Sequence, residues 1–122
     1  MQLSYRFGFD AAHHFDDFPA GHPYRGMHGH SFQVEIAVAG QPDPASGFVL
    51  DFAAIEAAAL EVRGVLDHRV LNEIEGLSRP SLENLCLWIW NALAPRLPAF
   101  ASVAVRRDSC GQGCTYTGPA GR

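Results

Sequence analysis

The fold is decided by an alternating stretch of sequence, HGHSFQVEIAV, at residues 28–38. The residues of one parity are histidine or apolar: His28, His30, Phe32, Val34, Ile36 and Val38. The residues between them are small or polar: Gly29, Ser31, Gln33 and Glu35. Successive side chains of a β-strand point to opposite faces, so this pattern predicts a half-buried strand with both histidines on its inward face.

A second alternating stretch precedes the first, at residues 1–13. Its apolar side chains fall on odd positions: Leu3, Tyr5, Phe7, Phe9 and Ala11. His13 shares that parity, whereas His14 points the other way. Residues 15–27 break the pattern and contain Pro19, Gly21, Pro23 and Gly26, which predicts a long loop between two strands.

Two helices and two further strands follow. Asp51 and Ser81 are suitable N-caps for helices whose apolar residues recur at three- and four-residue spacing. In the first helix these residues are Phe52, Ile55, Ala59, Val62 and Leu66, and in the second they are Leu82, Leu85, Ile89, Leu93 and Leu97. Strands are expected around Val103–Val105 and Tyr116. The order ββααββ predicts one α+β domain, residues 1–122, with the helices on one face of an antiparallel sheet.

Composition narrows the possible functions. The formal charge of −4 argues against a broad nucleic-acid surface, which needs clustered basic residues. We find neither a signal peptide nor a membrane-spanning run, and expect a cytoplasmic protein. Three cysteines, an odd number, do not form a secreted disulfide framework. A short four-stranded sheet has open edges, so we expect a homo-oligomer.

Three histidines form a candidate metal site. If the two strands pair, His13, His28 and His30 converge at the mouth of the loop. Three imidazoles with one open position are typical of catalytic zinc, which polarises a substrate oxygen. The alternative is that each is a core histidine with an ordinary hydrogen-bond partner.

Five segments, in this order and spacing, resemble the 6-pyruvoyltetrahydropterin synthase family, most closely its 6-carboxytetrahydropterin synthase branch. They are FDAAHHF (9–15), MHGHSF (27–32), GFVLDF (47–52), LDHRVLN (66–72) and RPSLENL (79–85). The resemblance implies a tunnelling fold, in which trimers close a β-barrel and stack into a hexamer with active sites at subunit interfaces. It also implies Zn²⁺ on His13, His28 and His30, and a substrate such as dihydroneopterin triphosphate. Queuosine, biopterin and folate metabolism all use related proteins.

The sequence departs from this family at its catalytic cysteine. That residue lies four positions before the HGH motif, where this chain has Tyr24. Its Asp-His partner pair is matched by Asp67 and His68, although Asp67 also suits a turn. Tyr24 could act in catalysis, as an acid or as a phenolate. Alternatively, it only fills space or stacks on a ligand. His22 or His68 could serve as the base in place of the cysteine.

A second departure concerns the family's pterin-anchoring glutamate, which is Asp108 here. A carboxylate can still bind an amidine-like ring edge, but Asp108 also suits a strand-end cap or an ion pair with Arg106 or Arg107. Arg25, Arg106 and Arg107 are candidates for a triphosphate, or solvated surface charges. Cys110 and Cys114 are interpreted as structural.

Three functions are considered for this chain. The first is a zinc-dependent lyase resembling 6-pyruvoyl- or 6-carboxytetrahydropterin synthase, acting on dihydroneopterin triphosphate or a related reduced pterin, with altered chemistry such as retro-aldol cleavage. The second is a non-catalytic zinc-containing homologue that binds a pterin or purine. A structural oligomer is a third reading. Tyr24 discriminates: at the metal's open position it favours catalysis, and as a plug it favours binding.

Overall fold

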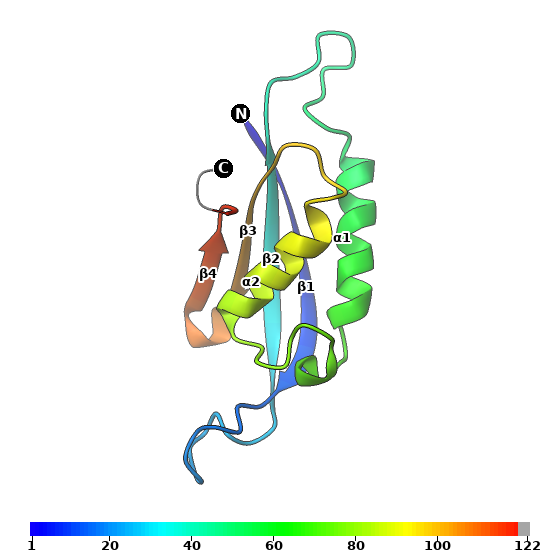
Figure 1. Cartoon of the computed structure of the whole chain (residues 1–122). Coiled ribbons are helices and arrows are strands. Elements are labelled where there is room, and N and C mark those ends of the chain that lie inside the picture. Colours follow the sequence, from blue (N-terminus) through cyan, green and yellow to red (C-terminus); the bar gives the residue numbers. More distant parts are fainter. Residues whose placement is uncertain (120–122) are drawn as a thin grey trace.

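The computed structural model describes residues 1–119 and has the predicted ββααββ order. Four strands form one antiparallel sheet in the order β1-β2-β3-β4: β1 (Gln2–His13), β2 (His28–Ala39), β3 (Phe100–Arg107) and β4 (Gln112–Tyr116). Both helices, α1 (Phe52–Leu66) and α2 (Leu82–Leu93), cover the same face of this sheet (Figure 1). The α+β prediction is confirmed, whereas the trimeric barrel stays a prediction.

The two helices begin where their capping residues predict. A side-chain oxygen of Asp51 accepts a hydrogen bond from the Ala53 amide, and Ser81 accepts one from the Asn84 amide. These bonds satisfy backbone donors that have no partner within a first helical turn. The buried helix residues pack against the inward parity of β2, and the largest fully buried side chains include Phe32, Ile36, Ile55, Leu85 and Ile89.

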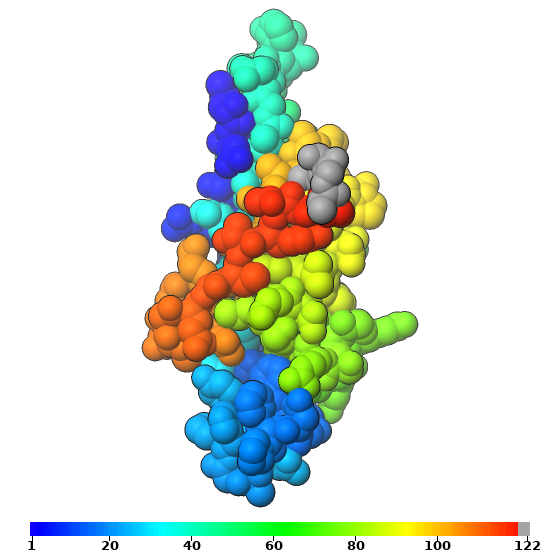
Figure 2. Space-filling model, turned by 60° about the vertical axis from the view of Figure 1, so that its left-hand side comes forward, coloured from blue at the N-terminus to red at the C-terminus, as the bar shows by residue number. Residues whose placement is uncertain are grey.

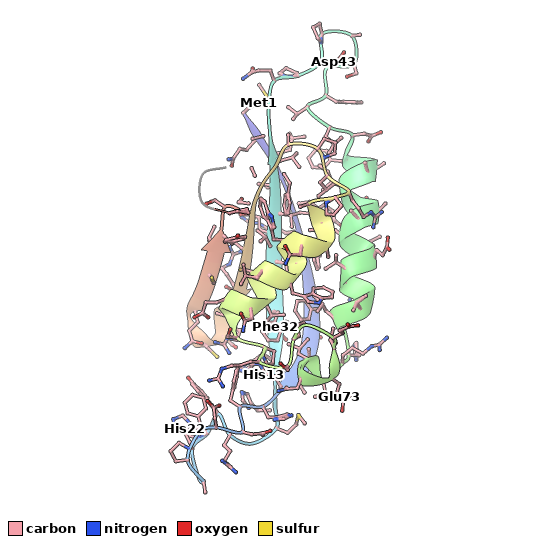
Figure 3. The ribbon with its side chains drawn as sticks, in the orientation of Figure 1. Met1, His13, His22, Phe32, Asp43 and Glu73 are labelled. Carbon is pink, nitrogen blue, oxygen red and sulfur yellow. The ribbon has the colours of Figure 1, made fainter. Side chains whose placement is uncertain are left out.

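Register between β1 and β2 sets the histidine geometry. The strands pair without a shift over the whole of β1, so His13 lies opposite His28 and Ala11 opposite His30. The loop between them, residues 14–27, projects from that end of the sheet, with His13 at its base and His22 near its tip (Figures 2 and 3). The loop end of the hairpin therefore carries all three imidazoles.

The segment after α1 runs beside the outer edge of β1. The His68 amide donates to the Asp10 carbonyl at 2.7 Å, and the Ala12 amide donates to the Arg69 carbonyl at 2.9 Å. A short 3₁₀ helix, η1 (Leu71–Glu73), follows, and a second, η2 (Asp108–Cys110), joins β3 to β4. Among the described residues, no helix has the length and apolar character needed to cross a membrane.

Candidate metal site and adjoining cavities

The three predicted histidines lie together. The ring centroid of His13 is 4.5 Å from that of His28 and 4.9 Å from that of His30. The centroids of His28 and His30 are 5.0 Å apart. One nitrogen from each ring can be chosen so that all three lie within 4.8 Å of one another. His13 is fully buried and the other two are partly exposed. The cluster therefore has a closed base and an accessible side.

Hydrogen bonds fix which nitrogen of each ring faces the cluster. His13 Nδ1 lies 3.3 Å from the Pro80 carbonyl oxygen, and His28 Nδ1 lies 2.7 Å from that of Gly26. Because a carbonyl only accepts, these Nδ1 atoms carry the proton and each Nε2 presents a lone pair. His30 Nδ1 lies 3.9 Å from the Cys110 sulfur. Such second contacts orient metal-binding histidines in proteins.

Two of these Nε2 atoms have no partner within the protein. The Nε2 atoms of His13 and His30 are buried and make no hydrogen bond to any described residue. Buried polar atoms without partners are rare, and a lone pair directed at two other imidazoles suits a cation. The residues present therefore fit a divalent metal ion bound by three Nε2 atoms.

Burial favours the neutral form of two rings of the cluster, His13 and His30. Burial lowers the pKa of His13 from 6.5 to about 4, assisted by the charges of His28, His30 and Arg107, against the opposing hydrogen bond to Pro80. Burial also lowers the pKa of His30, followed by the charges of Arg107 and His28. Metal ions bind the neutral form of imidazole, so near neutral pH these ligands need lose no proton.

Tyr24 lies in the projecting loop beside His28. The two ring centroids are 6.2 Å apart with an interplanar angle of 25°, and Tyr24 also contacts Phe18 and His22. Tyr24 and His28 line the same cavity, of about 420 Å³. The tyrosine is 44% exposed, so it forms a wall of this cavity rather than a plug.

His22 and Arg25 make their contacts within this loop and do not line the cavity. The His22 ring accepts a hydrogen bond from the Tyr24 amide and stacks on Phe18. Arg25 donates to the carbonyls of Asp16 and Phe18, at 2.5 and 2.6 Å. Neither residue lines the 420 Å³ cavity.

Asp67 and His68 lie in a different cluster, with Asp10 at the edge of β1. Asp67 accepts a hydrogen bond from the Asp10 amide, which lowers the pKa of its carboxyl, as do the charges of Arg63 and His68. A nitrogen of the His68 ring is 3.7 Å from the Asp67 carboxylate, and its side chain is 80% exposed. The backbone of His68 is left-handed, with φ 58°, a strained conformation for a non-glycine residue.

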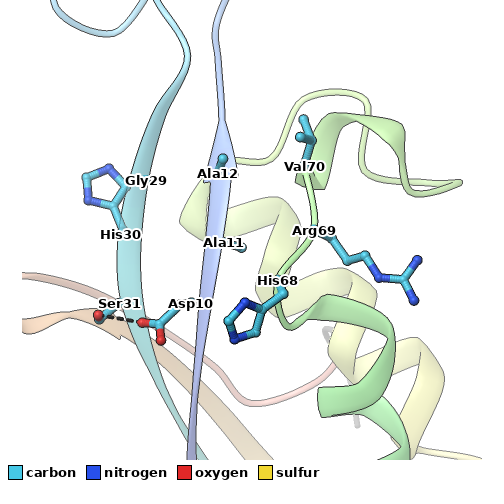
Figure 4. A pocket seen from close by; sticks show the side chains of 9 residues that line it. All are labelled: Asp10, Ala11, Ala12, Gly29, His30, Ser31, His68, Arg69 and Val70. Carbon is cyan, nitrogen blue, oxygen red and sulfur yellow. Dashed lines mark hydrogen bonds between the residues drawn. The ribbon is translucent and has the colours of Figure 1, made fainter.

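A second cavity, of about 550 Å³, adjoins this pair (Figure 4). Its lining includes Asp10, Ser31, His30 and His68, and the Ser31 hydroxyl donates to the Asp10 carboxylate at 2.5 Å. His30 and His68 thus line one cavity, but within the described residues the His68 ring belongs to the group with Asp10 and Asp67 and not to the three-histidine cluster.

Arg107 and Asp108 are adjacent in the chain but have different surroundings. Asp108 is 65% exposed and lies 3.4 Å from Arg106, the ion pair considered as an alternative, and it does not line the 420 Å³ cavity. Arg107 lines that cavity, and sequence reasoning gave it only as one of three arginines. Arg107 has the same strand parity as the buried Val103 and Val105, whereas Arg106 has the opposite parity. This alternation is the feature of the sequence that could have distinguished the two arginines.

Comparison with known proteins identifies the family. Residues 2–119 match the family model described as 6-pyruvoyl tetrahydropterin synthase. The chain is 34% identical over 112 residues to the dihydroneopterin monophosphate aldolase of Pyrococcus furiosus, covering 92% of this chain and 90% of the relative. It is 32% identical over 126 residues to the 6-carboxy-5,6,7,8-tetrahydropterin synthase of Synechocystis, covering 98% and 95%.

The fold agrees with these matches. The 6-pyruvoyl tetrahydropterin synthase structure from Caenorhabditis elegans superposes with a TM-score of 0.86 at 21% identity, covering 98% of this chain and 96% of that one. At 21% identity the superposition shows only that the fold is shared, and the family assignment rests on the sequence matches. This chain belongs to the 6-pyruvoyl tetrahydropterin synthase family.

Proposed function

We propose that this chain is a zinc-dependent lyase that cleaves the side chain of a phosphorylated, reduced neopterin by a retro-aldol reaction. The observation that carries the proposal is the set of three histidine Nε2 atoms beside an open cavity of about 420 Å³. Two of these atoms are buried without a partner, which suits a bound cation. Neutral imidazoles are good ligands for zinc, although related divalent ions also accept them.

The missing thiol favours cleavage over the family's synthase reactions. Tyr24 lies four residues before the HGH motif, where the resemblance places the family's cysteine. Cys110, the cysteine nearest the cluster, contacts the Nδ1 side of His30, behind the ring, and therefore does not face a ligand held by Nε2. The resemblance to a relative named as an aldolase, over nine-tenths of both chains, supports the same choice.

The proposed reaction breaks the C1′–C2′ bond of the neopterin side chain. A base removes the proton of the 2′-hydroxyl, C2′ becomes an aldehyde carbonyl, and the bonding electron pair passes to C1′, where the C6–N5 imine of the ring delocalises it. A proton then returns to C1′. The products are a 6-hydroxymethyl dihydropterin and a two-carbon aldehyde that retains any phosphate on C3′. A bound zinc ion supplies Lewis-acid polarisation of the side-chain oxygens.

The chain's own residues supply the proton transfers in this proposal. Tyr24 lines the cavity beside His28 and is assigned the proton that returns to C1′. Asp67 and His68 are assigned the base. Because His68 is exposed and separate from the histidine cluster of its own chain, we assign it to the cluster of a neighbouring copy, as active sites at subunit interfaces require.

The test is turnover of 7,8-dihydroneopterin, its monophosphate and its triphosphate by zinc-loaded protein, with products resolved by chromatography. We expect a 6-hydroxymethyl dihydropterin, lost in His28→Ala and reduced about 100-fold or more in Tyr24→Phe, as for removal of a general acid or base. Carboxy- or pyruvoyl-tetrahydropterin instead would refute the aldolase assignment and restore the synthase reaction. Tight binding of all three pterins without any product would favour the non-catalytic homologue.

A further inference from the structure

Within residues 1–119, three buried side-chain polar atoms have no hydrogen-bond partner: two belong to the three-histidine cluster, and the third belongs to Arg107, which lines the cavity beside His28. They are His13 Nε2, His30 Nε2 and Arg107 Nε. The two imidazole lone pairs are accounted for by a cation. The Arg107 Nε–H is a donor and requires the opposite, an acceptor. A buried donor of this kind without an acceptor is unfavourable, so a bound ligand that supplies an acceptor oxygen would satisfy it.

Strand geometry directs Arg107 to this place. It is the last residue of β3, on the parity of Val103 and Val105, whose side chains are fully buried. Arg107 lines the cavity of about 420 Å³ together with His28, a member of the three-histidine cluster. Arg106 has the other parity and lies 3.4 Å from the Asp108 carboxylate.

The charges lining the 420 Å³ cavity leave Arg107 unmatched. Arg79, the second arginine of the lining, is already 2.7 Å from Asp17 and lies over the Phe15 ring. Glu83 also lines the cavity, but no carboxylate of residues 1–119 lies within salt-bridge distance of Arg107. An arginine fork that is charged, partly buried and unpaired is well suited to a phosphate.

We propose that Arg107 binds the phosphate ester of the substrate and sets the preference for phosphorylated over unphosphorylated ligands, with Arg79 as a second cation on the same cavity. This inference rests on the proposed function for the identity of the ligand, a phosphorylated pterin. It adds that the phosphate lies between two arginines beside the metal, with the aromatic side chains of Phe15, Phe18 and Tyr24 on the remaining wall.

The test compares two fluorescent ligands, neopterin and neopterin monophosphate, binding to zinc-loaded protein. Arg107→Gln removes the charge, and Arg106→Gln is the matched control on the opposite face of the same strand. In the unmodified protein we expect the phosphate to tighten binding about 10- to 100-fold, the worth of a charge-assisted hydrogen bond to a buried group. Arg107→Gln should lose this advantage while keeping its affinity for neopterin, and Arg106→Gln should keep both.

Two results would overturn the inference: an undiminished phosphate advantage in Arg107→Gln, or an equal loss of affinity for both ligands, which indicates a structural role. If Arg107→Gln does not fold, Arg107→Lys replaces it, and the phosphate advantage must still fall relative to Arg106→Lys. If the unmodified protein binds neither pterin, the proposed function fails, and calorimetry with inorganic phosphate decides the subsite alone. Phosphate binding that Arg107→Gln abolishes then supports it, and equal binding by both proteins refutes it.

Discussion

The buried histidine of the cluster predicts a specific acid sensitivity of the metal-free protein. Burial lowers the pKa of His13 from 6.5 to about 4, so the folded chain binds a proton at this ring less readily than the unfolded chain does. Between those two pH values the unfolded state is protonated at His13 and the folded state is not. The free energy of unfolding therefore falls as the pH falls through this window, and the contribution is fully present above pH 6.5.

The magnitude follows from the pKa values. At about 1.4 kcal/mol per pH unit, the difference between 6.5 and about 4 corresponds to a loss of about 3 kcal/mol. A small domain has a total stability of about 5–15 kcal/mol, so this loss is large enough to measure. His30, whose pKa is also lowered by burial, adds to it in the same direction.

The assay is urea unfolding of metal-free protein at pH 7.5 and pH 4, for the unmodified chain, His13→Gln and His14→Gln. The neighbour His14 is a suitable control because it has the opposite parity and lies outside the three-histidine cluster. We expect the pH-dependent loss to shrink by about 3 kcal/mol in His13→Gln and to be unchanged in His14→Gln. Equal pH dependence in all three proteins, or an NMR titration of His13 near its ordinary pKa of 6.5, would refute the reasoning.

Three further outcomes are expected. His28→Ala should reduce bound zinc from one ion per chain to none at micromolar zinc, by elemental analysis, because it removes one of three ligands. Cys110→Ala should weaken zinc binding about 10-fold or more in a chelator competition, because the sulfur contacts His30 Nδ1 from behind, whereas Ser109→Ala should not. Ile36→Ala should lower the free energy of unfolding by about 2–5 kcal/mol in urea at pH 7.5, because this fully buried side chain leaves a cavity between sheet and helices.

The sequence by itself determined the elements and the metal-site candidates. Alternation of apolar and polar residues assigned each strand residue to a face, and this local property selected His13 over His14 and placed His28 and His30 together. Capping residues located both helix starts, since Asp51 and Ser81 act on amides two or three residues away. The ordered motifs indicated the family, which the comparisons show.

Only the tertiary structure decided how the site is completed. The Pro80 carbonyl that orients His13 is 67 residues away in sequence, and no periodicity predicts such a contact. Arg107 and Asp108 are adjacent in the chain but have different surroundings, because β3 ends between them. Of the two, only Arg107 lines the cavity on the helix side of the sheet. Strand parity says which face a residue occupies, but only the packing of distant segments decides which charges meet there. That packing puts Arg107 on the cavity lined by His28, with no hydrogen-bond partner for its Nε among the described residues.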